Sequence, residues 1–158
     1  LFACYTGTAY ADAVSITREN LFQDDEGSLW LKYRRKKTDY LGRVKLLPEA
    51  LALIGKYRDD TRITLFPPQD YHTLRANMKS LRLMAGLSQD LVYHMARHSF
   101  GTLTLTAGIP IESIARMMGH TNIDSTQVYA QVTDRKISSD MDRLMERRKP
   151  AAGKEAAG

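Results

Sequence analysis

The sequence predicts an α+β fold that is mainly helical and contains one small antiparallel sheet. Apolar residues recur at helical spacing through most of the chain after residue 48, whereas strand-like alternation is confined to residues 29–47. A chain of 158 residues is long enough for one domain with its own core. We expect that domain to span residues 1–149 and a disordered Ala/Gly-rich tail to follow at residues 150–158.

Short helices and a hairpin are expected before residue 48. Leu29, Leu31 and Tyr33 alternate with Trp30 and Lys32, which is the period of a strand. The expected elements are a helix end at residues 1–5 that Thr6-Gly7 interrupts, a helix at 12–17, a turn at 24–27, a strand from 29 to 33, a basic hairpin tip at 34–38 and a return strand at 43–47.

Helices follow one another after residue 48. Pro48 suits the first turn of a helix, and Asp70 can cap the next one, which ends at Gly86. Two further helices are expected at residues 91–107 and 111–118. Another is expected to start at residue 124, with Asp124 and Gln127 as a capping box. The last is expected at residues 135–147 and carries an apolar stripe of Ile137, Met141, Leu144 and Met145.

The helix after Asp70 carries two neighbouring stripes. One is apolar and is expected to face the core: Leu74, Met78, Leu81 and Ala85. The other is basic: Arg75, Lys79 and Arg82. We hypothesise that the basic stripe contacts phosphates, and a merely solvated face is the alternative.

The helix expected at residues 91–107 carries the motif His94-x-x-Arg97-His98. Its apolar face is expected to pack on the core: Ala96, Phe100, Leu103 and Ala107. The opposite face is expected to point outward, with a glycine that lets a bulky ligand approach closely: His94, Arg97, His98 and Gly101.

Two further segments complete a chemically informative set. Met118-Gly119-His120 ends one expected helix, and Tyr129 lies in the early turns of the next. A tyrosine can supply an oxygen nucleophile, an arginine can neutralise phosphoryl oxygens and histidines can move protons. Together these residue types can cleave a phosphodiester without a metal.

Composition is consistent with a nucleic-acid partner. The formal net charge is +5, which favours a polyanion, although a merely basic protein would share it. Cys4 is the only cysteine, so the chain can form no internal disulfide, as is usual in a reducing cytoplasm. No apolar run reaches the length of a membrane span, and no signal peptide is recognisable.

The ordered motifs resemble the catalytic domain of the tyrosine recombinase, or phage integrase, family. Residues 94–102 match its central box, Met118-Gly119-His120 matches its leucine-glycine-histidine box, and Tyr129 stands where the family has its nucleophile. Residues 6–12 and 94–98 look closest to integrases of conjugative transposons. The resemblance covers residues 1–145 and implies the tyrosine recombinase catalytic-domain fold.

The resemblance also implies a role for each residue. Tyr129 attacks a DNA phosphorus and forms a 3′-phosphotyrosine, Arg97 stabilises the transition state, and His94 assists removal of the tyrosine proton. His120 donates to a non-bridging oxygen, and Lys37, with Lys36 as the fallback, protonates the leaving oxygen. No metal and no cofactor are implied. The residues expected to contact DNA are Arg35, Lys36, Arg75, Lys79, Arg82 and His98.

Ala9 is the main departure from the family pattern. Most members carry an arginine two residues after the glycine of the Thr-Gly pair, and Ala9 stands there instead. Either one catalytic arginine suffices or another basic residue takes the place, with Arg18, Arg35 and Arg43 as candidates. Asp12 aligns with the acidic residue that supports this box.

Other functions remain as alternatives. His94 and His98 are spaced as in some zinc sites, but Met95 stands where such a helix would carry a glutamate base. Ala9 would suit a catalytically impaired, DNA-binding relative. A type IB topoisomerase would use the same tyrosine chemistry.

The resemblance implies double-stranded DNA at an attachment or core site as the partner, a homotetramer in the synaptic complex and a monomer without DNA. The chain starts at Leu1 without an initiator Met, so we interpret it as a fragment that lacks arm-binding and core-binding domains. We expect it to act in the cytoplasm, on the nucleoid, and not at a membrane.

Overall fold

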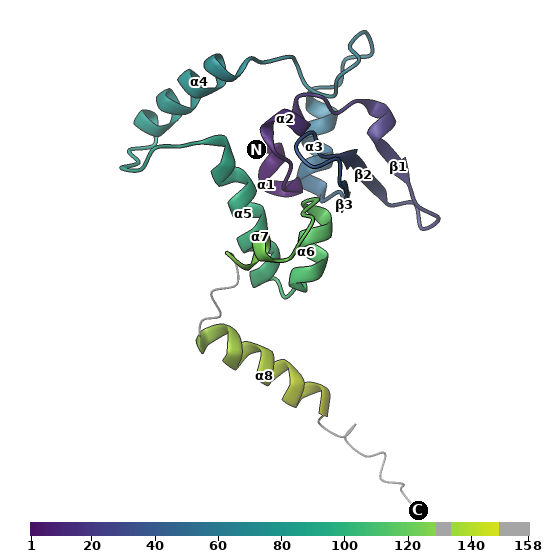
Figure 1. Ribbon diagram of the computed structural model, residues 1–158, viewed down its shortest axis with the longest axis vertical. Helices are drawn as coiled ribbons and strands as arrows, with labels where there is room; N and C mark the ends of the chain where they lie inside the picture. The colour runs from purple at the N-terminus through teal and green to yellow at the C-terminus, as the bar shows by residue number, and fades with distance from the viewer. Residues whose placement is uncertain (129–133, 149–158) are drawn as a thin grey trace, which may run out of the picture.

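The computed structural model describes residues 1–128 and 134–148 of the chain (Figure 1). It is mainly helical with one three-stranded antiparallel sheet, as the sequence predicts. The elements in chain order are α1 (Phe2–Thr6), α2 (Tyr10–Ala13), the short 3₁₀ helix η1 (Arg18–Asn20), β1 (Leu21–Gln23), β2 (Leu29–Arg34), β3 (Leu41–Lys45), α3 (Pro48–Lys56), α4 (Tyr71–Met84), α5 (Tyr93–Thr106), α6 (Ile111–Met117), α7 (Asp124–Gln127) and α8 (Asp134–Arg148).

The sheet has the order β1-β2-β3 and buries one face. Leu31 pairs with Val44 in the register, and both side chains are almost fully buried, whereas Lys32 and Arg43 pair on the exposed face. This two-residue alternation is what the sequence predicts for residues 29–33. The return strand is displaced from the expected residues 43–47 to Leu41–Lys45.

Two clusters of buried side chains flank the sheet. The first joins the sheet to α1 and α3 through Phe2, Ile16, Leu31, Tyr33, Leu46, Ala50 and Leu65. The second joins β3 to α5 and α6 through Val44, Phe100, Ile114 and Met118. Because α1 also packs on α5, the helices that carry the expected site residues are fixed to the sheet.

The expected helix at residues 12–17 is wrong in its bounds. The helix α2 ends at Ala13, because the chain beyond it extends to pair with the loop after α3. Leu65 N donates to Ile16 O at 2.8 Å, and Thr17 bridges to Thr64. The strand β1, which has only three residues, was not expected.

The capping predictions differ in outcome. Pro48 begins α3, and the Asp70 side chain accepts from Thr73 N at the start of α4, as expected. The capping box at α7 is wrong: Ile123 is the N-cap residue, and Asp124 lies inside the helix. Asp124 instead accepts a side-chain hydrogen bond from Asn122.

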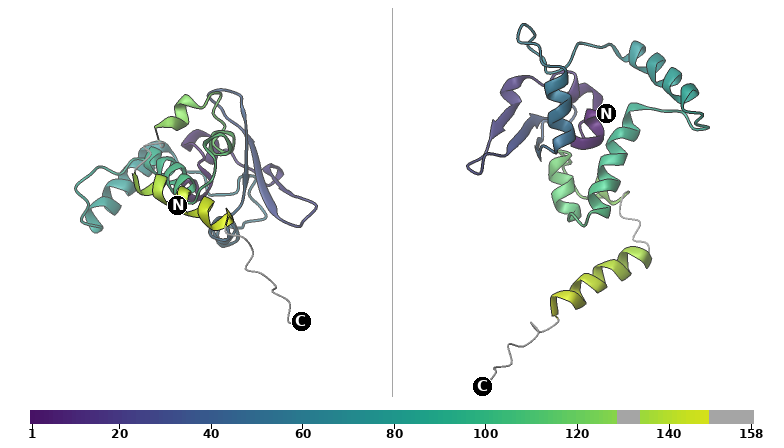
Figure 2. Two further views of the ribbon diagram at one scale, coloured as in Figure 1. Left: turned by 90° about the horizontal axis from the view of Figure 1, so that it is seen from below. Right: turned by 180° about the vertical axis from the view of Figure 1, so that it is seen from behind.

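Two helices project from the main body. α4 extends away from it, as Figure 2 shows from behind, and buries none of its residues. Its expected core stripe is therefore wrong: Leu74 and Met78 are half-buried, and Leu81 is 55% exposed. The ribbon of α8 stands off from the other helices in Figure 1, with its apolar stripe exposed, although the Arg143 side chain reaches Gly108 after α5. Tyr129 and the expected tail at residues 150–158 fall outside the described residues.

Candidate active site

A pocket of about 300 Å³ opens between the hairpin tip, α5 and the segment after α6. We call it the basic pocket. No aspartate or glutamate is among the described residues that line it, so its charge suits an anion. Its lining residues are Arg35, Lys37 and Thr38 from the hairpin, His94, Arg97 and His98 from α5, and His120, Thr121, Ser125 and Val128 from the last segment.

Arg97 lies at the centre of this arrangement and is only 2% exposed. Its Nη1 donates to the Gly7 carbonyl, and its Nη2 donates to the Met118 carbonyl at 2.7 Å. These bonds tie the ends of α1 and α6 to α5 around one cation. The expectation that Arg97 lies on an outward face of its helix is therefore wrong.

The buried face of α5 differs from the expected one. Phe100 is buried as expected, but Leu103 is 59% exposed. Gly101 and Thr104 are buried on the same helix as Arg97, so the expectation that Gly101 lets a ligand approach from solvent is wrong. The physical reason is that carbonyl acceptors at Gly7 and Met118 compensate the buried guanidinium.

His120 is held as a neutral acceptor. Arg97 has only donors, so His120 Nε2, 2.7 Å from Arg97 Nη2, must accept that hydrogen bond. His120 Nδ1–H then donates to Thr126 Oγ1 at 2.7 Å. Burial, followed by the charges of Arg97 and Arg35, lowers the pKa of His120 to about 4. Donation by His120 to a phosphate oxygen, as expected, stays a prediction and requires one of these bonds to be exchanged.

His94 and His98 stand edge to face on α5, with ring centroids 4.5 Å apart. Partial burial, then the neighbouring His98, Arg97 and Arg35, lower the pKa of His94 below its usual 6.5. A neutral His94 at the pocket wall can accept a proton. Among residues 1–128 and 134–148, no group of three or more His, Cys, Asp or Glu residues is placed to hold a metal ion.

The hairpin tip reaches the pocket because Asp12 holds it. The buried Asp12 carboxylate accepts from the Lys36 backbone N–H at 2.9 Å and lies 3.5 Å from Arg35 Nε. This places Arg35 and Lys37 in the pocket wall, whereas Lys36 is exposed and is not among the lining residues.

Other expected site residues lie elsewhere. Arg75 and Lys79 are exposed on the projecting α4, and Arg82 bonds to Asp90 at 2.6 Å and to the loop after α4. Tyr129 lies outside the described part of the chain, but Val128, which precedes it, lines the pocket.

Sequence reasoning missed several contributors to the site. The Gly7 and Met118 carbonyls bear no sequence signal, because any residue carries one. Thr126 and Ser125 are separated from His120 by a turn, and only the fold shows that Thr126 meets the imidazole. The one sequence feature that pointed to Thr126 is its position between His120 and Tyr129.

Comparison with known proteins assigns this architecture to a class. The profile of the phage integrase family matches residues 1–136, and the chain belongs to that family. The integrase of Escherichia phage P2 is 30% identical over 125 residues, which cover 79% of this chain and 34% of that protein. The chain thus spans about a third of that relative's length.

Solved structures agree on the fold. The crystal structure of XerA recombinase superposes with a TM-score of 0.67 at 23% identity, covering 93% of this chain and 55% of that one. The Tn1549 transposon integrase in complex with transposon right end DNA superposes with a TM-score of 0.64 at 18% identity, covering 91% and 57%. The fold is that of tyrosine recombinase catalytic domains.

Proposed function

We propose that residues 1–149 are the catalytic domain of a site-specific DNA recombinase that cuts and rejoins DNA through Tyr129. The observation that carries this proposal is the basic pocket, which joins a buried Arg97 to His94, His120 and Lys37 beside the residue that precedes Tyr129. The pocket presents cations and neutral imidazoles without a carboxylate among its described lining residues, as a phosphodiester site requires.

The chemistry needs only groups of the chain. The Tyr129 oxygen attacks phosphorus and transfers its proton to neutral His94, while the bond from phosphorus to O5′ breaks. Lys37 protonates the leaving O5′, and Arg97 stabilises the charge on the non-bridging oxygens. A 3′-phosphotyrosine and a free 5′-hydroxyl result. The phosphotyrosine linkage retains the energy of the broken phosphodiester bond. The reverse attack by a 5′-hydroxyl can therefore rejoin the strand without an added energy source.

The substrate we infer is double-stranded DNA at the ends of a mobile element, which the protein would integrate or excise in the cytoplasm. The Tn1549 integrase was solved with transposon end DNA, which supports this class of substrate. Assembly into a tetramer on DNA, from a monomer in its absence, is part of the proposal. Light scattering of the DNA-free chain should give the monomer mass, and a stable tetramer would contradict it.

Covalent trapping tests the proposed activity. The chain is incubated with nicked duplexes tiled from the DNA that flanks its gene, and an SDS-resistant adduct is sought in the presence of EDTA. We expect an adduct with the wild-type chain and none with Tyr129→Phe, while Tyr40→Phe on the hairpin should behave like wild type. An adduct that requires a divalent metal, or that survives Tyr129→Phe, would overturn the proposal.

Ala9 favours one alternative, a DNA-binding relative that has lost catalysis. This alternative and the proposed recombinase differ in whether a covalent adduct forms with DNA. The impaired relative would retard its own site on a gel and form no adduct with it.

A further inference from the structure

The buried Asp12 carboxylate lies in the turn that follows Ala9. By the family resemblance, Asp12 aligns with the acidic residue that supports the box in which Ala9 replaces an arginine. Asp12 is only 3% exposed, and among the described residues its Oδ2 has no hydrogen-bond partner. A buried carboxylate requires a nearby cation, so the position left by Ala9 should be compensated from another part of the chain.

Arg35 is that cation. Its Nε lies 3.5 Å from Asp12 Oδ2, and its side chain is 13% exposed, so the pair is largely withdrawn from water. The Lys36 backbone N–H donates to the other carboxylate oxygen, which fixes the strand end that carries Arg35. Arg35 also lines the basic pocket together with Arg97.

The aliphatic part of the Arg35 side chain packs closely on Gly119. A Cβ at Gly119 would come within 2.8 Å of Arg35 Cγ and 2.9 Å of its Cδ, so the stem lies directly on this glycine. Gly119 adopts φ +64°, and its neighbour His120 accepts from Arg97. The stem therefore passes beside the segment that positions the other arginine.

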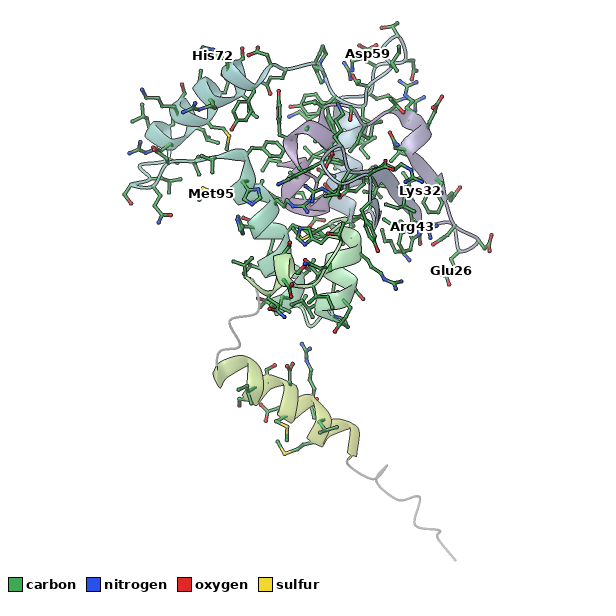
Figure 3. The ribbon with its side chains drawn as sticks, viewed as in Figure 1. Glu26, Lys32, Arg43, Asp59, His72 and Met95 are labelled. Carbon is green, nitrogen blue, oxygen red and sulfur yellow. The ribbon has the colours of Figure 1, made fainter. Side chains whose placement is uncertain are left out.

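Arg18 and Arg43 do not line the basic pocket. Arg18 pairs with Asp60 at 2.9 Å and donates to the carbonyl of Asp59, whose loop lies at the top of the molecule in Figure 3. Arg43 stands over the Phe22 ring on the exposed face of the sheet, and Figure 3 shows it on the opposite side from Met95 of α5.

We propose that Arg35, anchored by Asp12 and seated on Gly119, supplies the second guanidinium of the phosphate site in place of the arginine absent at Ala9. This inference rests on the proposed function. Arg35 would contact a non-bridging oxygen of the scissile phosphate, opposite the charge supplied by Arg97. The hairpin would thus contribute both a phosphate-binding cation and, through Lys37, the proton for the leaving oxygen.

The test compares rates of covalent adduct formation on the trapping duplex. Arg35→Ala should slow the reaction by about 100-fold or more, as is typical when one charge-stabilising donor is removed. Arg43→Ala and Arg18→Ala are matched controls and should stay within about threefold of wild type. The double variant Ala9→Arg with Arg35→Ala should react at least about tenfold faster than Arg35→Ala alone, because residue 9 lies in the same turn as Asp12.

A second substrate distinguishes contact of Arg35 with the phosphate from a purely structural role of Arg35. Once the cleaved linkage is mapped, a methylphosphonate at that position removes the oxygen charge that Arg35 is proposed to neutralise. On this neutral linkage the Arg35→Ala deficit should shrink to less than about tenfold. A deficit of equal size on both substrates, or an Arg35→Ala rate equal to that of Arg43→Ala, would overturn the inference alone. A wild-type chain that forms no adduct would overturn it together with the proposed function.

Discussion

At Arg97, stability and charge placement depend on the same hydrogen bonds. Arg97→Ala would leave the Gly7 and Met118 carbonyls and His120 Nε2 without their donor in a buried site. Each unsatisfied buried group costs about 1–3 kcal/mol, so we expect a loss of about 3 kcal/mol or more in the free energy of unfolding. Urea denaturation measures this.

The control for this variant is Arg75→Ala on the projecting α4, which should change the free energy of unfolding by less than about 0.5 kcal/mol. An Arg97→Ala chain as stable as the control would show that the three bonds contribute nothing. Arg97→Lys should retain the positive charge but lose the planar set of guanidinium donors. Its stability should therefore lie between those of the wild-type chain and Arg97→Ala.

Neutral His120 predicts a loss of stability in mild acid. Its pKa falls from 6.5 to about 4 on folding, so the unfolded chain takes up this proton at a higher pH than the folded chain. The stabilising contribution is therefore complete above pH 6.5 and is lost as the pH falls towards about 4. The lowered pKa of His94 acts in the same direction.

Urea titrations at about pH 7, 5.5 and 4.5 measure this slope. His120→Gln keeps a carbonyl that can accept from Arg97 but removes the titration, so the decline should become shallower. His72→Gln, at an exposed position of α4 (Figure 3), is the matched control. An unchanged slope in His120→Gln would contradict the assignment of this pKa.

Among the helices and their ends, two glycines with nearly the same positive φ allow a matched comparison. Gly119 and Gly86 have φ +64° and +63°, but an added Cβ meets the Arg35 stem only at Gly119, and nothing lies within 4 Å at Gly86. Alanine at either position should cost about 1 kcal/mol of stability through the left-handed backbone.

The two variants should differ in activity. Gly119→Ala displaces the Arg35 stem and should slow adduct formation by about tenfold or more, because small misplacements of a charge-bearing group are costly. Gly86→Ala should react at the wild-type rate. Equal rates for both variants would mean that the Arg35 stem does not depend on Gly119.

The sequence predicts elements well where the pattern is local. Pro48, Asp70 and the alternation at Leu31 and Tyr33 mark features that the structure confirms, because capping and pleating depend on near neighbours. The buried face of α5 was predicted wrongly, since an arginine is normally exposed and Arg97 is buried by carbonyls from distant segments. Motif order predicted that His94, Arg97 and His120 come together, as they do in the pocket lining, but not that Asp12 would bring Arg35 there.

At the scale of the whole molecule, α4 is attached to the body largely through its first turn. Tyr10 contacts Tyr71 of α4 and Tyr93 of α5, and its hydroxyl donates to the Gln69 carbonyl at 2.6 Å. Arg75 and Lys79 are exposed on this projecting helix and are not among the described residues that line the pocket. We expect them to contact the DNA backbone beyond the cleavage site.

A salt titration of DNA binding tests this placement. Weak binding with a steep salt dependence is expected, and Arg75→Gln with Lys79→Gln should reduce the slope of log affinity against log salt by about 1.8, or about 0.9 per phosphate contact. Fluorescence anisotropy measures it. Lys56→Gln with Arg58→Gln removes two exposed charges near the end of α3 as the control. A double α4 variant that keeps the wild-type slope would contradict the placement.

We expect the basic pocket to serve a tyrosine that becomes covalently attached to DNA. The most direct measurement is mass spectrometry of the nuclease- and trypsin-treated adduct, with end-labelled DNA to define the strand polarity. We expect a nucleotide on Tyr129, joined through the 3′ phosphate, and a free 5′-hydroxyl on the other fragment. Attachment to a different residue, or a 5′-linked phosphate, would contradict it.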